Sequence, residues 1–495
     1  MIDRSSGILM PMSSLPSPYG IGTMGKSAFQ FVDFLAAAGQ KYWQLLPLGP
    51  TSYGDSPYQS FSTFAGNPYF IDLDLLVKDK LLKPAELKNR DWGSDPARVD
   101  YGRIYENRFA VLRLAFERGA ERCAEEIAAF RQENAGWLEN YALFMAIKRS
   151  EGMRAWTEWP EALRLRREDA LESARSELRE DVDFFVFVQF LFFRQWDALR
   201  AYAKEKGIRF IGDVPIYVAL DSADVWSEPH FFQLDEKNLP TAVAGVPPDP
   251  FTEDGQLWGN PLYDWDAMKR DGYGWWIRRI DGARKLYDVL RIDHFRGFES
   301  YWAVPYGDTT AKNGVWKPGP GMGLVGVLNA WFRDLDFIAE DLGYTTPEVR
   351  RLLEDSGLPG MKVLEFAFDP EGNSDFLPHN CLPNSSCYIG THDNETVQGW
   401  LKSATKGELR FAERYLHITG DEGWNWGMIR AGMATTSRLF VVQMQDVLEL
   451  GADARMNAPG TSTGNWQWRM LPGALDRNLA KKLKTYTETY RRVCS

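Results

Sequence analysis

The sequence Val289-Leu290-Arg291-Ile292-Asp293 is a short run of branched apolar side chains that ends in a carboxylate. Runs of four to eight residues with this composition are typical of buried β-strands. Seven other runs share the character, and several also end in a polar or charged residue. They lie at residues 7–10, 42–46, 209–213, 336–340, 361–366, 388–393 and 439–445. The sequence therefore predicts eight strands.

Helical patterns lie between several of these runs. Residues 27–38 place Ala28, Phe31, Val32 and Leu35 on one face, and residues 346–357 begin with Thr-Pro and end with Gly. Eight strands that alternate with helices predict an α/β protein with a (β/α)₈ TIM barrel. A doubly wound open sheet is the alternative, but it does not explain why acidic residues end runs spread through the whole chain.

The spacing between the predicted strands is uneven. We expect residues 1–495 to form a single catalytic domain, interrupted by a mostly helical insertion at about 75–180. Two further stretches, at about 244–266 and 296–328, are predicted to be long active-site loops, because loops of that length in a compact barrel are usually functional. The chain ends in a basic helix, which leaves no room for a C-terminal β-sandwich domain.

Composition excludes several classes of protein. The formal net charge is −11, from 57 basic and 68 acidic residues, which disfavours nucleic acid and anionic membranes as partners. We find no secretory signal and no apolar run near the ~20 residues of a membrane span. The four cysteines show no CxxC spacing, which predicts a cytoplasmic location. Aromatic residues make up 14% of the chain, which fits both a large core and a surface that stacks on sugars.

Four carboxylates, Asp213, Asp293, Glu340 and Asp393, each end a different predicted strand. In a barrel, the C-terminal ends of the strands converge on the face that holds active sites. Any one of these residues could simply be a polar strand end or a helix cap, but four together indicate glycoside chemistry. In that chemistry one carboxylate attacks the anomeric carbon and another delivers a proton to the leaving oxygen.

Arg291 strengthens this interpretation, because residues i and i+2 of a strand face the same side. Its guanidinium should therefore lie beside Asp293 and favour the ionised form that a nucleophile requires. Glu340 has no basic neighbour in sequence, so its pKa can be raised as a general acid requires. These arguments leave both Glu340 and Asp341 open as the acid.

A family resemblance emerges from eight motifs. They are YGDSPYQS at 53–60, GDVPIYV at 212–218, GVPPD at 245–249, QLWGNP at 256–261, RIDHFRGF at 291–298, AEDLG at 339–343, GTHDN at 390–394 and GNW at 464–466. In this order, over nearly the whole chain, they resemble the amylomaltase family of 4-α-glucanotransferases, glycoside hydrolase family 77 of the α-amylase clan. One departure is Pro250, where the family commonly has another side chain.

The resemblance implies a TIM barrel that transfers α-1,4-glucan segments to the 4-OH of an acceptor glucan or glucose. The implied mechanism is a retaining double displacement without metal or organic cofactor, and the implied partners are maltooligosaccharides, amylose, starch or glycogen. Asp293 would be the nucleophile, Glu340 the general acid/base and Asp393 the third carboxylate. The glucan-binding residues implied are Tyr58, Asp213, Gln256, Trp258, Arg291, His294, Asp369, His392 and Asn465.

Other interpretations fit the sequence less well. Residues 460–464 match the GxSxG motif of serine hydrolases, and residues 321–326 match GxGxxG, but neither has the strand that these motifs need before them. A metal site built from Asp293-His294 and His392-Asp393 would place Arg291 against the cation. A non-catalytic glycan-binding protein would need the aromatic residues but not the pair of Arg291 and Asp293.

Overall fold

Eight parallel strands form the central sheet of the protein, as a computed structural model shows. The structure describes residues 2–52, 54–249, 252–343, 345–372, 374–461 and 463–493, so Pro250, Phe251 and Ser462 lie outside the described residues. The strands are β1 (Ser5–Leu9), β2 (Tyr42–Gln44), β3 (Arg209–Val214), β6 (Val289–Ile292), β9 (Asp336–Ala339), β10 (Gly360–Val363), β11 (Ser385–Tyr388) and β12 (Leu439–Gln443). Their order is β10-β11-β12-β1-β2-β3-β6-β9.

The two outer strands of this order close the sheet on itself. The Ala339 N–H of β9 donates a 2.9 Å hydrogen bond to the carbonyl of Pro359, immediately before β10. Each neighbouring pair from β10 round to β9 is parallel. The predicted (β/α)₈ barrel is therefore confirmed.

Each predicted run contains or overlaps one barrel strand, but the seventh is misplaced. Residues 388–393 were predicted to be extended, whereas β11 ends at Tyr388. The chain then turns, and the Asn394 Oδ1 accepts hydrogen bonds from the Thr391 N–H (2.9 Å) and hydroxyl (2.8 Å). A side-chain oxygen that satisfies the backbone in this way stabilises a turn and ends the strand.

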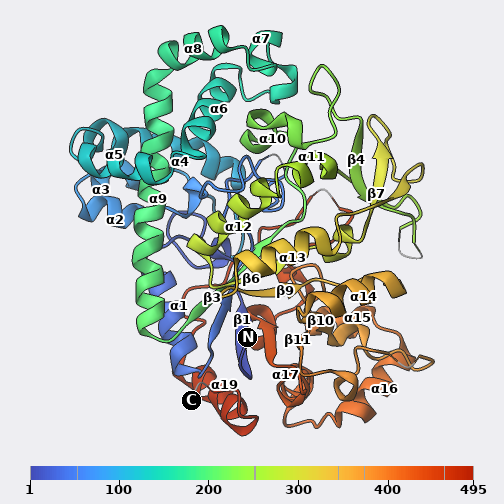
Figure 1. Ribbon diagram of the computed structural model, residues 1–495. Coiled ribbons are helices and arrows are strands. Elements are labelled where there is room, and N and C mark those ends of the chain that lie inside the picture. The colour runs from blue at the N-terminus through green and yellow to red at the C-terminus, as the bar shows by residue number, and fades with distance from the viewer. Residues whose placement is uncertain are drawn as a thin grey trace.

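Helices surround the barrel (Figure 1). Beyond the insertion they are α1 (Lys26–Ala37), α10 (Ala223–Ser227), α11 (Trp265–Arg270), α12 (Gly274–Leu286), α13 (Met322–Trp331), α14 (Pro347–Ser356), α15 (Val397–Ser403), α16 (Lys406–Leu416), α17 (Gly423–Ala434), α18 (Met444–Val447) and α19 (Arg477–Thr489). In α14 the Thr346 hydroxyl caps the Val349 N–H, Pro347 opens the first turn and Gly357 ends the helix with φ 69°. The Thr-Pro start and the Gly end that predicted this helix from the sequence are therefore its actual start and end.

Between β2 and β3 the chain forms a helical insertion. Its helices are α2 (Leu73–Lys78), α3 (Pro84–Lys88), α4 (Tyr101–Gly119), α5 (Ala124–Glu133), α6 (Leu138–Ser150), α7 (Glu161–Arg164), α8 (Glu168–Glu177) and α9 (Arg179–Glu205). Helix α9 runs from the insertion down the side of the barrel (Figure 1). The buried Gln189 amide of α9 exchanges hydrogen bonds with both the N–H and the carbonyl of Gly66, which ties the insertion to the loop after β2.

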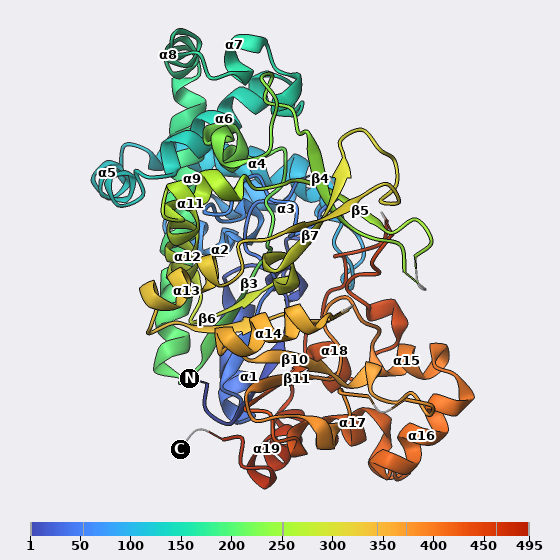
Figure 2. The same ribbon diagram turned by 45° about the vertical axis from the view of Figure 1, so that its right-hand side comes forward.

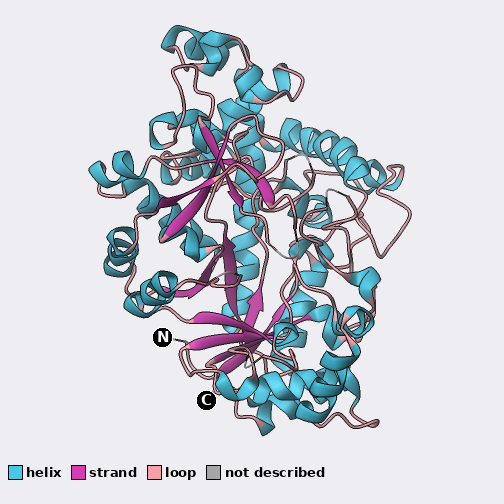
Figure 3. Ribbon diagram, turned by 90° about the vertical axis from the view of Figure 1, so that its right-hand side faces the viewer, coloured by secondary structure: helices cyan, strands magenta, loops and turns pink. Residues whose placement is uncertain are grey.

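A second, antiparallel sheet occupies stretches that the sequence indicated to be loops. Its strands are β4 (Ala242–Val246), β5 (Gln256–Pro261), β7 (Ser300–Pro305) and β8 (Val315–Pro318), in the order β5-β4-β7-β8. Figure 3 shows them as a group of strands separate from the barrel. Val243, Val304 and Ala311 form a small apolar cluster against Trp302. The loop predictions at 244–266 and 296–328 are therefore wrong for these residues.

Helix α13 corrects another expectation. Residues 322–328 fall within the loop predicted at about 296–328, but α13 begins at Met322 and buries Leu324, Val325 and Leu328. After β12 the described chain forms α18, the 3-10 helix η8 (Ala452–Ala454), an irregular stretch with an isolated bridge between Trp468 and Arg98, and α19. Helix α19 packs on α1 near the N-terminus (Figure 2). Among the described helices, none is long and apolar enough to cross a membrane.

Gly212 generates a stability prediction. A Cβ at this position of β3 would lie 2.1 Å from ring carbons of Tyr287, which is fully packed against the barrel. We expect Gly212→Ala to lower the free energy of unfolding by about 1–3 kcal/mol through overpacking. Gly326→Ala is the matched control, because a Cβ there meets nothing within 4 Å and alanine favours the helix by about 0.5–1 kcal/mol. Thermal melting of both variants checks this, and equal melting temperatures would contradict it.

Candidate active site

Three of the four carboxylates lie at the C-terminal ends of their strands, and Asp393 lies five residues beyond the end of β11. Asp213 lies in β3, while Asp293 and Glu340 directly follow β6 and β9. The barrel hydrogen bonding continues through them: the Asp293 N–H donates to the Val214 carbonyl (3.0 Å) and the Glu340 N–H donates to the Ile292 carbonyl (3.0 Å). Backbone pairing therefore fixes the relative positions of Asp293 and Glu340.

Arg291 joins two of these carboxylates. Its Nη1 lies 2.7 Å from both oxygens of Asp213 and 2.9 Å from the Oδ1 of Asp293. The pairing of Arg291 and Asp293 predicted from the i, i+2 spacing is thus confirmed. Burial opposes the charge on Arg291, but the two carboxylates outweigh it and hold the pKa of the guanidinium well above its ordinary value. The side chain of Asp213 is 0% exposed and that of Asp293 is 28% exposed, so only Asp293 is open to a substrate.

Tyr58 extends this cluster toward the second half of the barrel. Its hydroxyl donates a 2.9 Å hydrogen bond to the Oδ2 of Asp213. Its ring stacks on His392, with centroids 5.1 Å apart and an interplanar angle of 18°. Trp466 lies against both rings, at 5.8 Å from Tyr58 and 6.0 Å from His392. Tyr58 therefore connects the Arg291 cluster to His392 and so to Asp393.

Glu340 is a buried carboxyl group held by the backbone. Its Oε2 accepts a 2.7 Å hydrogen bond from the His294 N–H, and its Oε1 accepts one of 2.7 Å from the Leu342 N–H. Burial is the main cause that raises the pKa of Glu340 to about 8; the charge of Asp293 raises it further, while Arg291 and the two N–H groups oppose. At neutral pH the group is therefore mostly protonated and can donate a proton.

Asp341, the other candidate for the acid, is committed to the backbone. Its Oδ1 accepts a 2.7 Å hydrogen bond from the Met361 N–H at the start of β10. Burial raises the pKa of Asp341 as well, but its contacts lie with the next strand and none joins it to Asp293. The structure therefore separates the two carboxyl groups: Asp341 is held by β10, whereas Glu340 is held by the N–H of His294, the residue after Asp293.

His294 owes its place to a left-handed backbone conformation, with φ 51°. A non-glycine residue rarely adopts this conformation, and here it turns the N–H toward Glu340. The imidazole ring meets Trp258 edge to face, with centroids 4.8 Å apart. Burial lowers the pKa of His294 to about 4, although Asp293 opposes this, so the ring is neutral near pH 7. The indole N–H of Trp258 in turn donates to the Gln256 Oε1 at 3.1 Å.

Asp393 follows β11 after the turn and has a more open environment. Its side chain is 42% exposed, and its Oδ2 lies 3.4 Å from the Nε2 of His392. Its Oδ1 accepts a 2.6 Å hydrogen bond from the Nδ2 of Asn457. Asn457 and Trp466 were not among the residues predicted, although Trp466 belongs to the GNW motif. The sequence carries no signal for Asn457 beyond its place two residues before a proline.

Asp369 and Asn465 are not joined to the carboxylates by any contact. Asp369 is exposed, and its Oδ1 accepts from the Glu371 N–H. The Asn465 side chain closes its own loop, because its Oδ1 accepts from the Ala458 N–H at 3.0 Å and its Nδ2 donates to the Thr461 carbonyl at 3.0 Å. Their predicted role in binding glucan therefore stays a prediction.

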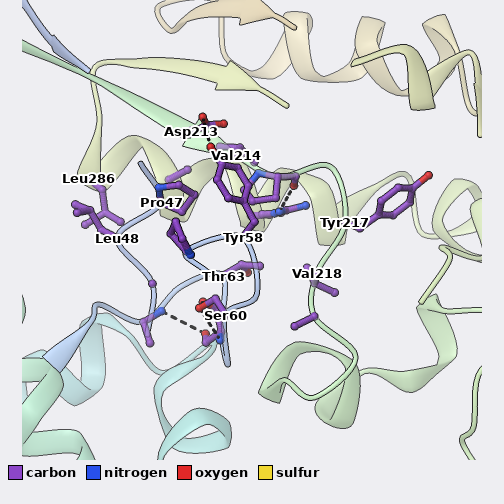
Figure 4. A pocket seen from close by; sticks show the side chains of 18 of the residues that line it. Pro47, Leu48, Tyr58, Ser60, Thr63, Asp213, Val214, Tyr217, Val218 and Leu286 are labelled. Carbon is purple, nitrogen blue, oxygen red and sulfur yellow. Dashed lines mark hydrogen bonds between the residues drawn. The ribbon is translucent and has the colours of Figure 1, made fainter. Parts of the chain in front are cut away.

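A small cavity borders Tyr58 and Asp213 (Figure 4). Its volume is about 60 Å³, and its walls include Pro47, Leu48 and Val218. None of Asp293, Glu340 and Asp393 lines it. At roughly 10–15 Å³ for each buried water, the cavity suits a few water molecules. Because it is too small and borders none of these three carboxyl groups, it is not the place where a sugar reacts.

The alternative chemistries receive no support from the described part of the chain. Among those residues, no group of three or more His, Cys, Asp or Glu side chains is arranged to hold a metal ion. The residues around the GxSxG match form a turn, with φ 81° at both Gly460 and Gly464, rather than a strand followed by a helix. Asp293 and His294 therefore belong to the carboxylate site.

Comparisons with known proteins agree with this geometry. The family model described as 4-alpha-glucanotransferase matches residues 10–475. The chain belongs to the 4-alpha-glucanotransferase family. It is 49% identical over 503 residues to the 4-alpha-glucanotransferase of Thermus thermophilus, covering 99% of this chain and 100% of that one. It is 47% identical over 485 residues to the Clostridium butyricum enzyme, covering 98% and 100%.

A solved member of the family has the same fold. The amylomaltase from Streptococcus agalactiae, determined in complex with acarbose, superposes with a TM-score of 0.97 at 45% identity, covering 99% of this chain and 100% of that one. The general mechanism of the 4-alpha-glucanotransferase family is a retaining double displacement.

The pair of Arg291 and Asp213 generates a second stability prediction. Arg291→Met leaves the buried Asp213 without a counter-charge, and we expect the free energy of unfolding to fall by about 3–5 kcal/mol. The double variant Arg291→Met with Asp213→Asn removes that charge and should recover part of the loss, because the two residues are directly coupled. Urea denaturation followed by tryptophan fluorescence measures both. Losses that simply add would contradict the coupling.

Proposed function

We propose that this member of the family cuts α-1,4-glucans with Asp293 and Glu340 and transfers the cut segment to the 4-OH of a second glucan or of glucose. The single observation that carries the proposal is the contrast between the two carboxyl groups. Asp293 is open to solvent and paired with Arg291, whereas Glu340 is buried with its pKa raised to about 8. A carboxyl group kept protonated near neutral pH is what a general acid requires, and an accessible carboxylate beside a cation is what a nucleophile requires.

In the first displacement, a carboxylate oxygen of Asp293 forms a bond to the anomeric carbon of the donor. The bond from that carbon to the glycosidic oxygen breaks, and the leaving chain takes a proton from Glu340. In the second displacement, the Glu340 carboxylate takes the proton from the acceptor 4-OH. The acceptor oxygen then bonds to the anomeric carbon, and Asp293 leaves. Both steps invert the carbon, so the α-configuration is retained.

The remaining residues divide between binding and support. Asp393 and His392 would hold sugar hydroxyls and favour the distorted ring of the transition state, and the rings of Tyr58 and Trp258 supply apolar surface beside them. Gln256, His294, Asp369 and Asn465 complete the proposed glucan contacts. Asp213 is fully buried between Arg291 and Tyr58, so we assign it to holding Arg291 instead of touching the sugar.

Transfer instead of hydrolysis requires that the acceptor reaches the glycosyl–enzyme before water does. Bulk water is at ~55 M, and positioning of a bound acceptor is worth an effective molarity of about 10⁵ M or more. We assign this positioning to the hairpin of β4 and β5, which carries Gln256, the half-exposed Leu257 and Trp258. Trp258 lies against His294, and this contact supports the assignment. Gln59 anchors the hairpin through the Trp258 carbonyl and the Asn260 side chain.

The proposed reaction needs no metal or organic cofactor, because two carboxyl groups suffice for each step. The net charge of −11 continues to disfavour nucleic acid and membrane partners. A cytoplasmic location stays a prediction from the sequence.

The raised pKa of Glu340 sets the pH dependence. Glu340 must be protonated in the free enzyme for the first displacement, so kcat/KM should fall about tenfold per pH unit above about pH 8. A pH series with maltotriose measures it. Asp446→Asn is the matched control, since burial also raises the pKa of Asp446, to about 7, away from the proposed reacting groups. If the fall of kcat/KM above about pH 8 is absent in the wild type, or shifts to another pH in Asp446→Asn, then Glu340 does not set it.

Maltotriose as sole substrate tests the transferase itself. We expect glucose and longer maltooligosaccharides with little net gain of reducing ends, read by chromatography and a reducing-sugar assay. Asp293→Asn should lower kcat by at least about 10⁴-fold, because no nucleophile remains. A slow fluorinated donor should label the peptide that contains Asp293. Mainly hydrolytic products would refute the transferase assignment, and a label on Asp393 would refute the nucleophile.

A further inference from the structure

The third carboxylate, Asp393, is held from a distant part of the chain. Asn457 lies in the segment after the 3-10 helix η8 and is 64 residues away in sequence. Its Nδ2 donates a 2.6 Å hydrogen bond to the Oδ1 of Asp393, and its backbone N–H donates to the His392 carbonyl at 3.1 Å. One residue therefore fixes both the carboxylate of Asp393 and the backbone immediately before it.

Arg455 completes this attachment from the same segment. Its Nη2 donates a 2.7 Å hydrogen bond to the Asp393 carbonyl, and its Nε donates to the Asn457 carbonyl at 2.8 Å. Its Nη1 forms an ion pair with Glu395, whose carbonyl accepts from Gln443 at the end of β12. The guanidinium therefore joins the Asp393 turn, the Asn457 segment and the barrel in one network.

This network matters because Asp393 has little else to orient it. It does not lie in a strand and its side chain is 42% exposed. Among the described residues, the only other side-chain partner of its carboxylate is His392 at 3.4 Å. A carboxylate on a turn would otherwise rotate about two bonds, whereas geometry held within about 0.5 Å is what catalysis requires. Asn457 supplies one neutral N–H donor that fixes the rotamer without neutralising the charge.

We propose that Asn457 is a positioning residue, which holds the Asp393 carboxylate in the orientation that the transition state requires. The inference rests on the proposed function. Asn457 touches no reacting atom in this scheme and acts only through Asp393. Its loss should therefore lower kcat with little change in KM, because Asp393 serves the transition state more than the ground state.

The substitution Asn457→Asp separates positioning from a merely structural role. It has the same shape, but it places a second carboxyl 2.6 Å from Asp393. Two carboxyl groups at that distance share a proton at low pH and repel each other once both ionise. The protonated aspartate can donate as asparagine does. The charged or titratable groups that face the pair are His392, Tyr58, Arg455 and Glu395, and all are unchanged in the variant.

The experiment measures kcat and KM for maltotriose disproportionation from pH 5 to pH 8, each value divided by that of the wild type. Dividing by the wild-type value cancels the pH dependence that Glu340 contributes to both enzymes. For Asn457→Asp the relative kcat should fall at least about tenfold between pH 5 and pH 8. For Asn457→Ala it should be lowered roughly 10–100-fold by the same factor at every pH. Asn384→Asp, an exposed asparagine that donates only to the Gly357 and Leu358 carbonyls, controls for the added charge.

Each outcome has one meaning. A relative kcat for Asn457→Asp that does not change with pH overturns the inference, as does wild-type kcat in Asn457→Ala. The same pH trend in Asn384→Asp would assign it to net charge and also overturn the inference. Melting temperatures identify variants that fail to fold, and Asn457→Asp, being isosteric, keeps the test available if Asn457→Ala unfolds. A wild type that produces no disproportionation would refute the proposed function instead.

Discussion

The site depends on the buried guanidinium of Arg291, which contacts the carboxylates of Asp213 and Asp293 at once. Asp213 and Arg291 are cross-strand neighbours in β3 and β6, so the barrel register itself brings them together. The fully buried Asp213 balances the charge on Arg291 before any substrate arrives. Arg291 can then also lie 2.9 Å from Asp293, which places its positive charge beside a solvent-accessible carboxylate. Without Asp213, the cation and the nucleophile would form an isolated pair free to move together.

Three carboxyl groups of similar chemistry acquire different properties from what surrounds them. Asp293 lies beside a cation, Glu340 lies in a buried pocket against two backbone N–H groups, and Asp393 stands on a turn with an amide donor. The left-handed backbone of His294 links the first two, because it directs an N–H to Glu340 one residue after Asp293. The differences come from strand position and neighbours, which raise the pKa of Glu340 and leave Asp293 and Asp393 partly exposed.

The sequence predicted the parts of the structure that follow from local pattern. The barrel strands are apolar runs, and side-chain alternation was enough to place Arg291 beside Asp293. The antiparallel sheet was missed for two reasons. Strand β8 is exposed at every residue and lies among Pro and Gly residues, so no buried apolar run marks it. Strands β4 and β7 are apolar and partly buried, but they lie in or beside the long stretches that were predicted to be loops. The end of β11 was misplaced because the apolar pattern continues to Ile389 while Asn394 turns the chain. No local sequence pattern could predict the contact of Asn457 with Asp393, because the two residues are 64 positions apart.

The long insertion between β2 and β3 has a consequence for synthesis. β2 ends at Gln44, and its partner β3 begins only at Arg209. At about 5–20 residues per second, the ribosome needs roughly 8–30 s to complete the stretch between them. During that time β2 presents an open strand edge, which is a hazard for aggregation. The insertion itself is held together only once α9 has been made, because Gln189 of α9 exchanges hydrogen bonds with Gly66, 123 residues earlier. The barrel itself closes last, because β1 pairs with β12 at residues 439–443.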